Sequence, residues 1–177
     1  MLTNLARSFA IVAALMASGF MATTASAENV NDSGSFEGSY VKREMSPIAD
    51  QDGHVLLLTE SKGKSSNPDG LIDGFATTVH EIADLTQGNG THQGYVIYTD
   101  GSDQEVVKFD GMVSTTIKDG KPSTTMKGDY VLVGGTGTLA GIEGQGTYSG
   151  YFTAEDKFHV DWEGSRTQPT SSMARSQ

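Results

Sequence analysis

Two histidines on either side of a short turn could do chemistry together. His80 stands in the run GFATTVHEIADL (residues 74–85) and His92 in THQGYVIYT (91–99). The residues QGNG (87–90) between them are typical of a hairpin turn, so pairing of the two runs brings the histidines to within a few rungs of each other. They could then transfer protons as a pair or bind one metal ion. The alternative is two exposed or hydrogen-bonded histidines without a catalytic role.

Charged residues on two later runs form a second candidate group. Lys108 and Asp110 alternate with apolar residues in 104–117, and Asp129 does so in 123–134. Inside a cavity these charges would shift one another's pKa, which would make Asp129 a candidate acid or base and the other two candidate ligand contacts. The alternative is that they lie on the solvated face of a sheet. We predict no bound metal and no cofactor.

Aromatic residues on the same runs are the candidates for contact with a hydrophobic ligand. They are Phe109, Tyr130 and Tyr95. Phe109 shares one face of its run with Val107 and Val113, and the opposite face is more mixed. Each run thus has an apolar face, but the sequence does not tell which face of the sheet points inward.

The elements that must position these residues are predicted to be strands. Eight runs are rich in Val, Ile, Thr, Tyr and Phe and are bounded by turn residues. Eight strands joined mainly by tight turns predict an antiparallel up-and-down barrel, because closure removes both sheet edges. The alternative is a two-sheet sandwich. No strong helix signal is present. The runs cover residues 39–46, 53–61, 74–85, 91–99, 104–117, 123–134, 144–153 and 157–167.

The stretch VLVGGTGTLAGIEGQGTYSGYF (131–152) is the most distinctive local feature. Seven of the seventeen residues from Gly134 to Gly150 are glycine. Their spacing does not match a dinucleotide-binding fingerprint, no long helix follows, and no Gly-Lys-Ser/Thr triplet indicates a phosphate loop. We predict instead a strand, one helical turn in TLAGI, and a strand with glycines 144, 146 and 150 on one face, where another element can approach closely.

The same stretch resembles the allene oxide cyclase and dirigent barrel families, and small secreted bacterial proteins of that barrel group. The resemblance rests on the motif glycines Gly134, Gly135, Gly137 and Gly141 before a final pair of strands. It implies an eight-stranded barrel with a hydrophobic cavity, often a homodimer or homotrimer, and in the enzymes a reactive apolar substrate steered without a cofactor. Where dirigent proteins commonly have Ala-Arg-Gly, this chain has Ile142, Glu143 and Gly144. We therefore assign no catalytic residue to this chain from the resemblance.

The two ends of the chain are predicted to lie outside the barrel. Residues 1–27 have an apolar core followed by Ala-Ser-Ala, which is typical of a secretory signal peptide cleaved after Ala27. We therefore expect a periplasmic or secreted protein. Residues 28–35 are interpreted as a flexible leader, 36–167 as the barrel domain and 168–177 as a disordered tail.

The net charge and the absence of cysteine limit the partners and the chemistry that this protein can have. Only Arg7 among the basic residues lies in the predicted signal peptide, so the remaining chain has 11 basic and 22 acidic residues, a net charge of −11. A nucleic acid or an anionic membrane is an unfavourable partner for such a surface. The absence of cysteine excludes thiol chemistry and cysteine-ligated metal.

Three functions remain. The first, which we prefer, is an exported barrel that binds a small hydrophobic molecule. The second is a cofactor-independent isomerase or cyclase, and the third is a structural or oligomerising barrel without a ligand.

Overall fold

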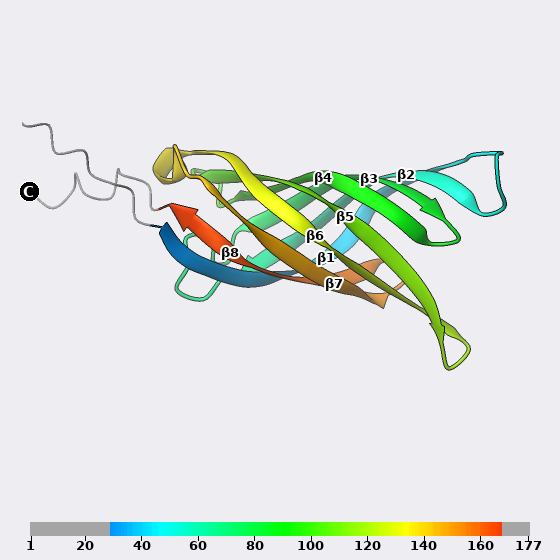
Figure 1. Ribbon diagram of the computed structural model, residues 1–177. Helices are drawn as coiled ribbons and strands as arrows, with labels where there is room; N and C mark the ends of the chain where they lie inside the picture. Colours follow the sequence, from blue (N-terminus) through cyan, green and yellow to red (C-terminus); the bar gives the residue numbers. More distant parts are fainter. Residues whose placement is uncertain (1–28, 168–177) are drawn as a thin grey trace, which may run out of the picture.

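The computed structural model describes residues 29–167 as one closed barrel of eight antiparallel strands in up-and-down order (Figure 1). This confirms the predicted fold class, including the single helical turn after the glycine motif. The predicted signal peptide and tail lie outside the described residues. The elements are β1 (Asn29–Pro47), β2 (His54–Ser66), β3 (Ala76–Thr86), β4 (Asn89–Thr99), β5 (Gln104–Lys118), β6 (Lys121–Thr136), the 3-10 turn η1 (Gly137–Leu139), β7 (Gly144–Ala154) and β8 (Lys157–Thr167).

Strict alternation along the strands separates lumen from solvent. On β5, Val107, Phe109 and Val113 are buried while the residues between them are more exposed, and on β8 Phe158, Val160 and Trp162 repeat the pattern. Side chains of a strand point alternately to the two faces of the sheet, so the apolar face lines the lumen. Register shifts interrupt the ladders of β1, β6 and β7, and such bulges bend strands in barrels.

The first strand is longer than predicted. Residues 29–35 are not a flexible leader: β1 begins at Asn29 and pairs with β8 from Thr167 onward. This polar segment is held by contacts distant in sequence. Asp32 pairs with Arg166, and Gly34 lies directly under the Trp162 ring. The leader prediction was wrong because small polar residues here serve as the closing strand of the barrel.

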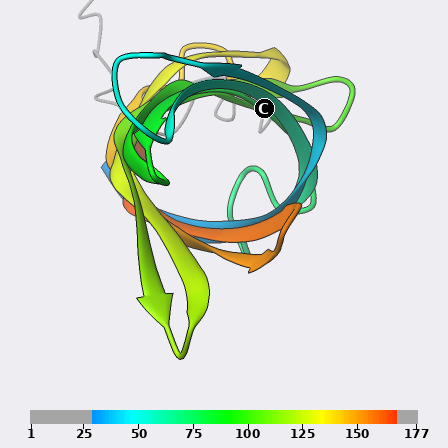
Figure 2. The same ribbon diagram turned by 90° about the vertical axis from the view of Figure 1, so that its right-hand side faces the viewer.

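One end of the barrel is closed by its own chain. The β2–β3 connection, residues 67–75, folds over this end and buries Ile72, while the β6–β7 connection buries Leu139 and Ile142. All three residues join the core cluster of the lumen. The 67–75 loop is visible through the ring of strands in the end-on view (Figure 2). The barrel is therefore plugged where its described termini lie.

Glycines facing the lumen let aromatic rings lie flat against the wall. A Cβ at Gly38 would lie 2.5 Å from the Phe158 ring, and one at Gly146 would lie 2.7 Å from the Tyr130 ring and 2.2 Å from the Glu163 carbonyl oxygen. Real Cβ contacts are not that short, so both positions require glycine unless the wall shifts. The predicted glycine face of β7 is thus the lumen face, where close approach is needed.

The opposite end carries the hairpins β1–β2, β3–β4, β5–β6 and β7–β8. The β5–β6 hairpin projects away from the ring of strands (Figure 2), and its Ile117 is 72% exposed. Residues 29–167 contain no helix long and apolar enough to cross a membrane.

Candidate functional site

The lumen contains a deep cavity next to a hollow at the hairpin end, which we call the mouth. The deep cavity measures about 70 Å³ and the mouth about 730 Å³. Tyr40, Glu81 and Met126 line both. Because small-molecule pockets are typically about 300–1,000 Å³, the deep cavity can take only a small group, whereas the mouth has room for a ligand body.

The wall of the deep cavity is mainly apolar, whereas the mouth also has polar side chains, among them Arg43, Thr124 and Glu155. Aromatic rings surround the deep cavity, where Phe36 meets Phe158 edge to face at 5.8 Å and Phe109 meets Tyr148 at 5.7 Å between ring centroids. The mouth is lined by a separate small cluster of Leu57, Ala83, Leu85 and Val113. A ligand that fills both spaces would therefore be apolar in the cavity and where it contacts this cluster of the mouth.

A chain of polar side chains crosses the lumen at the junction of the two spaces. Thr59 donates a hydrogen bond to Glu81 Oε2 at 3.0 Å. His92 Nδ1 lies 2.7 Å from Glu81 Oε1, and the Tyr148 hydroxyl lies 2.8 Å from His92 Nε2. The His92 side chain is only 2% exposed and that of Glu81 14%. Four strands, β2, β3, β4 and β7, thus contribute to one continuous hydrogen-bond chain, which we call the Glu81–His92–Tyr148 chain.

Two glycines make room for the end of this chain. Gly111 and Gly128 face each other across β5 and β6. A Cβ would lie 2.4 Å from the Tyr148 hydroxyl oxygen at Gly111 and 2.7 Å at Gly128. The Tyr148 ring therefore reaches from β7 across β6, with its hydroxyl over a bare patch of backbone. This places the hydroxyl beside His92 Nε2.

Burial keeps the tyrosines of the lumen protonated. Desolvation, with the charge of Glu81 as the next cause, raises the pKa of Tyr148 well above its ordinary range, and the same two causes raise that of Tyr40. Burial, followed by the charge of Asp32, raises the pKa of Tyr130 to about 12. These phenols are hydrogen-bonding groups at neutral pH and are not phenolate nucleophiles.

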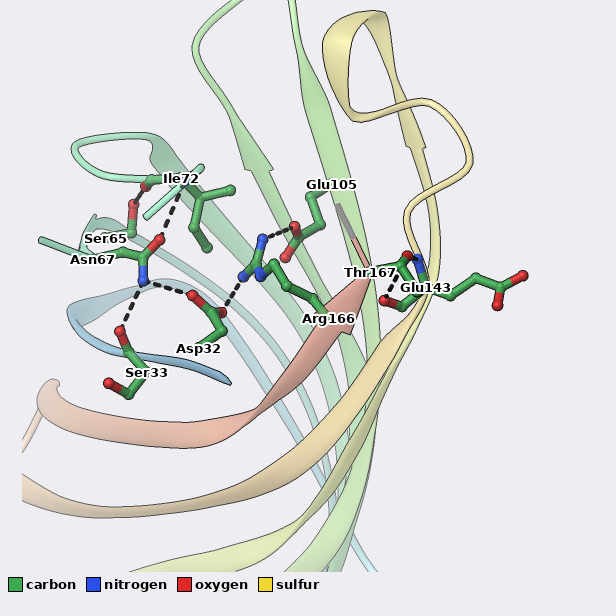
Figure 3. A network of polar contacts seen from close by, with 9 residues as sticks. All are labelled: Asp32, Ser33, Ser65, Asn67, Ile72, Glu105, Glu143, Arg166 and Thr167. Atoms are coloured by element: carbon green, nitrogen blue, oxygen red, sulfur yellow. Dashed lines mark hydrogen bonds and ion pairs between the residues drawn. The ribbon is translucent and has the colours of Figure 1, made fainter. Parts of the chain in front are cut away.

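A second polar cluster fills the closed end of the barrel (Figure 3). Arg166 Nη1 donates to Glu105 at 2.7 Å, and Nη2 pairs with Asp32. Asn67 Nδ2 donates to Asp32 at 3.0 Å and to the Ser33 carbonyl at 2.8 Å, which ties the 67–75 loop to β1. Burial raises the pKa of Glu105, and Arg166 opposes this rise. We call Asp32, Asn67, Glu105 and Arg166 the Arg166 cluster.

Structural support is the evident role of the Arg166 cluster. Its charges are almost completely buried, with Arg166 4% and Glu105 1% exposed. Among the described residues, three buried polar side-chain atoms lack a hydrogen-bond partner, Arg166 Nε, Ser61 Oγ and Thr77 Oγ1. The two terminal nitrogens of Arg166 pair with carboxylates, so the cluster holds three strands and a loop together.

The predicted histidine pair does not form. His92 lies in the lumen, but His80 is exposed on the outer face of β3, opposite Tyr95 of β4. The hairpin itself was placed correctly, because β3 and β4 join through Gln87 and Gly88, both with positive φ. The prediction was wrong because the two histidines lie on opposite faces of the sheet. In this register His92 lies opposite Ala83, and its hydrogen-bond partner in the lumen is Glu81.

The predicted charged group lies outside the barrel. Asp110 and Asp129 are exposed and directly opposite each other on the outer face of β5 and β6, and Lys108 lies opposite Tyr95 on the same face. None of these four residues lines the deep cavity or the mouth. They form part of the solvated face of the sheet, which is the alternative considered for the charges.

Two of the predicted ligand contacts do face the lumen. Phe109 is 7% exposed and lines the deep cavity with Tyr130.

Among residues 29–167 no group of three or more histidines and carboxylates is arranged to hold a metal ion.

The motif glycines have a structural role around η1. Gly137 has a φ of +62°, and any Cβ there would lie 1.9 Å from Asp103 Oδ1. Asp103 accepts the Thr138 backbone N–H at 3.1 Å and also pairs with the Thr138 hydroxyl. A Cβ at Gly135 would meet the Leu139 carbonyl at 2.3 Å, and Gly141 has a φ of +79°. Gly134 has open space around it. The motif shapes the turn that closes the barrel.

Sequence reasoning missed three members of the lumen chain, Thr59, Glu81 and Tyr148. For Glu81 a signal existed. A two-residue turn at Gln87 and Gly88 fixes which positions of the hairpin share a face, and this register puts Glu81 with His92. Tyr148 reaches His92 only after the barrel closes, so no local pattern could have identified it.

Comparisons with known proteins add little to this picture. No family model matches the chain, and no curated protein matches it. Among solved structures it is similar to the pterocarpan synthase dirigent protein GePTS1, with 10% identical residues and a TM-score of 0.44 over 80% of this chain and 85% of that one. No property of this chain or of its site is inferred from this similarity.

Proposed function

We propose that this protein binds a small, mainly apolar molecule in the lumen of its barrel. The observation that carries the proposal is the asymmetry of the lumen, which is plugged by Ile72, Leu139 and Ile142 at one end and hollow at the other. The ligand would enter through the mouth, place its apolar body against the Leu57, Leu85 and Val113 cluster, and direct a small group into the deep cavity.

Trp162 offers a built-in reporter for this proposal. It is the only tryptophan of the chain and lines the deep cavity. Titration with the neutral dye N-phenyl-1-naphthylamine, with excitation of Trp162, should give saturable energy transfer to bound dye. Val113→Asp places a carboxylate in the apolar cluster of the mouth and should weaken binding about tenfold or more, which corresponds to about 1.4 kcal/mol.

The matched control puts the same charge on the outside. Ile82 is 46% exposed, and Ile82→Asp should leave the dye affinity unchanged. Thr124→Tyr fills the mouth without adding charge and should also weaken binding, which covers the case of a poorly folded Val113→Asp. Absence of saturable transfer in the wild type, or equal loss in Ile82→Asp, contradicts lumen binding.

The polar chain also favours a second candidate, cofactor-free acid–base steering of the bound molecule. Glu81 and His92 form a hydrogen-bonded carboxylate–imidazole pair beside the cavity, which is the arrangement used in general acid–base catalysis. Mass analysis of the natural ligand before and after incubation with fresh protein separates the two. A ligand that stays unchanged supports binding alone.

We further propose that binding takes place after export. This rests on the signal-peptide pattern of residues 1–27 alone. Sequencing the amino terminus of the protein from its host tests it, with a start at Glu28 as the expected result.

A further inference from the structure

We propose that the site selects ligands bearing a hydroxyl or N–H group, because the Glu81–His92–Tyr148 chain presents only an acceptor oxygen to the ligand. The inference rests on the proposed lumen binding and names the chemistry of the group that enters the deep cavity. It follows from the order of donors and acceptors along the chain.

The order starts at Glu81. An ionised carboxylate only accepts hydrogen bonds, and its two oxygens lie 3.0 Å from Thr59 Oγ1 and 2.7 Å from His92 Nδ1. The proton of a neutral His92 must therefore sit on Nδ1. A carboxylate fixes the tautomer of a catalytic histidine in the same way in the serine protease triad.

The order then passes to Tyr148. With the proton on Nδ1, the His92 Nε2 atom is an acceptor, so the Tyr148 hydroxyl 2.8 Å away donates its only proton to it. Within the described residues this hydroxyl has no other hydrogen-bond partner. What the phenol retains is a lone pair on oxygen. A ligand carbonyl or ether oxygen has only lone pairs to offer, so it cannot form a hydrogen bond with this oxygen. A ligand O–H or N–H can donate a hydrogen bond to it.

Arg166 and Glu105 also line the cavity, and within residues 29–167 Arg166 Nε is a buried donor without a partner, so the preference for a donor group applies at the Tyr148 end of the cavity and not at the closed end. Arg166 and Glu105 lie at the closed end and pair with each other. The site therefore suits a molecule with an apolar body in the mouth and a single donor group at the end that enters the cavity.

The test compares two probes of nearly equal size and shape, cyclohexanol and cyclohexanone, by displacement of N-phenyl-1-naphthylamine at pH 8.5. One net hydrogen bond corresponds to about a 3- to 10-fold difference, so the alcohol should displace the dye that much more effectively. Tyr148→Phe should bring the ratio close to one while the dye still binds.

The matched control is Tyr95→Phe. Tyr95 is exposed on the outer face of β4 and lines neither the deep cavity nor the mouth, so the alcohol preference should persist. Equal displacement by both probes, a ketone preference, or no displacement by either while the dye binds would overturn the proposal. Failure of the dye to bind to the wild type contradicts lumen binding itself, and with it this inference.

A measurement without ligand tests which atoms of the Glu81–His92–Tyr148 chain carry the protons. Nitrogen NMR of labelled protein at pH 8.5 should show a protonated Nδ1 and an unprotonated Nε2 on His92, and Glu81→Leu should release this fixed tautomer. The opposite tautomer, or a doubly protonated ring, in the wild type overturns the proposal whatever the dye shows.

Discussion

Two polar clusters are buried in this barrel. They differ in whether their hydrogen-bonding groups are mainly paired within the protein or are partly available to a ligand. The Arg166 cluster joins β1, β5, β8 and the 67–75 loop through ion pairs and backbone contacts. The Glu81–His92–Tyr148 chain crosses the junction of cavity and mouth, contains no basic residue other than a histidine, and ends in a phenol oxygen with spare capacity.

The difference shows how one barrel can separate stability from recognition. A buried cluster of opposite charges is strongly destabilising to break, because the remaining charges lose their partners in a low-dielectric interior. A chain of single hydrogen bonds contributes little to stability per bond, so its members can be directed toward a ligand. Four predictions test this contrast, from the largest expected effect to the smallest.

Loss of the arginine should have the largest effect. Arg166→Met leaves Asp32 and Glu105 buried without their cation, and should lower the free energy of unfolding by about 3–5 kcal/mol. Urea unfolding followed by Trp162 fluorescence measures it. Arg43→Met, at an exposed arginine over the Tyr40 ring, is the control and should cost far less. Equal effects would show that the Arg166 cluster does not anchor the closed end.

Overpacking the glycine face should come second. Gly146→Val forces a side chain against Tyr130 and the Glu163 backbone, and should destabilise by about 1–3 kcal/mol. The control is Gly134→Ala, because Gly134 has open space around it. A thermal midpoint of Gly146→Val that matches the wild type would show that the β7 wall tolerates a side chain.

Removing the phenol hydroxyl should have a smaller effect. Tyr148→Phe removes one hydrogen bond to His92 and should reduce the free energy of unfolding by about 0.5–1.5 kcal/mol. The same unfolding experiment applies. A loss as large as that of Arg166→Met would mean that the chain is a structural element like the Arg166 cluster, and the contrast between the two would fail.

The smallest effect concerns a partly buried histidine at the hairpin end of the barrel. His54 lies 2.5 Å from Asp50 and 2.7 Å from Asp84, and hydrogen bonds first to Asp50 and then to Asp84 raise the pKa of His54. A raised histidine pKa stabilises the fold fully below the ordinary value of about 6.5, and this stabilisation is lost as the pH rises through the folded-state pKa.

The thermal midpoint of the wild type should therefore fall slightly as the pH is raised from below about 6.5 through the folded-state pKa of His54. This fall should be smaller in His54→Gln. An identical pH profile in both proteins would contradict the assignment.

Most of the fold could be predicted because it is encoded locally. Alternation and turn residues such as Gln87 and Gly88 mark strands and hairpins within a few positions, and the short turn after Gly137 follows from nearby glycines. Residues 29–35 were misjudged because their strand depends on Asp32 meeting Arg166, 134 positions away. No local pattern reports such a contact.

The site was predicted only in part for the same reason. Phe109, Tyr130 and His92 were selected by residue type and do face the lumen, whereas Asp129 and His80 were selected the same way and lie outside. Assignment to a face needs the register of each hairpin and the closure of the barrel. Residue type alone supplies neither.

Native mass spectrometry of the protein purified from its own host tests the central claim most directly. Lumen binding predicts an added mass of one small molecule per barrel in the wild type, lost in Val113→Asp and retained in Ile82→Asp. The bare protein mass in all three would contradict the account.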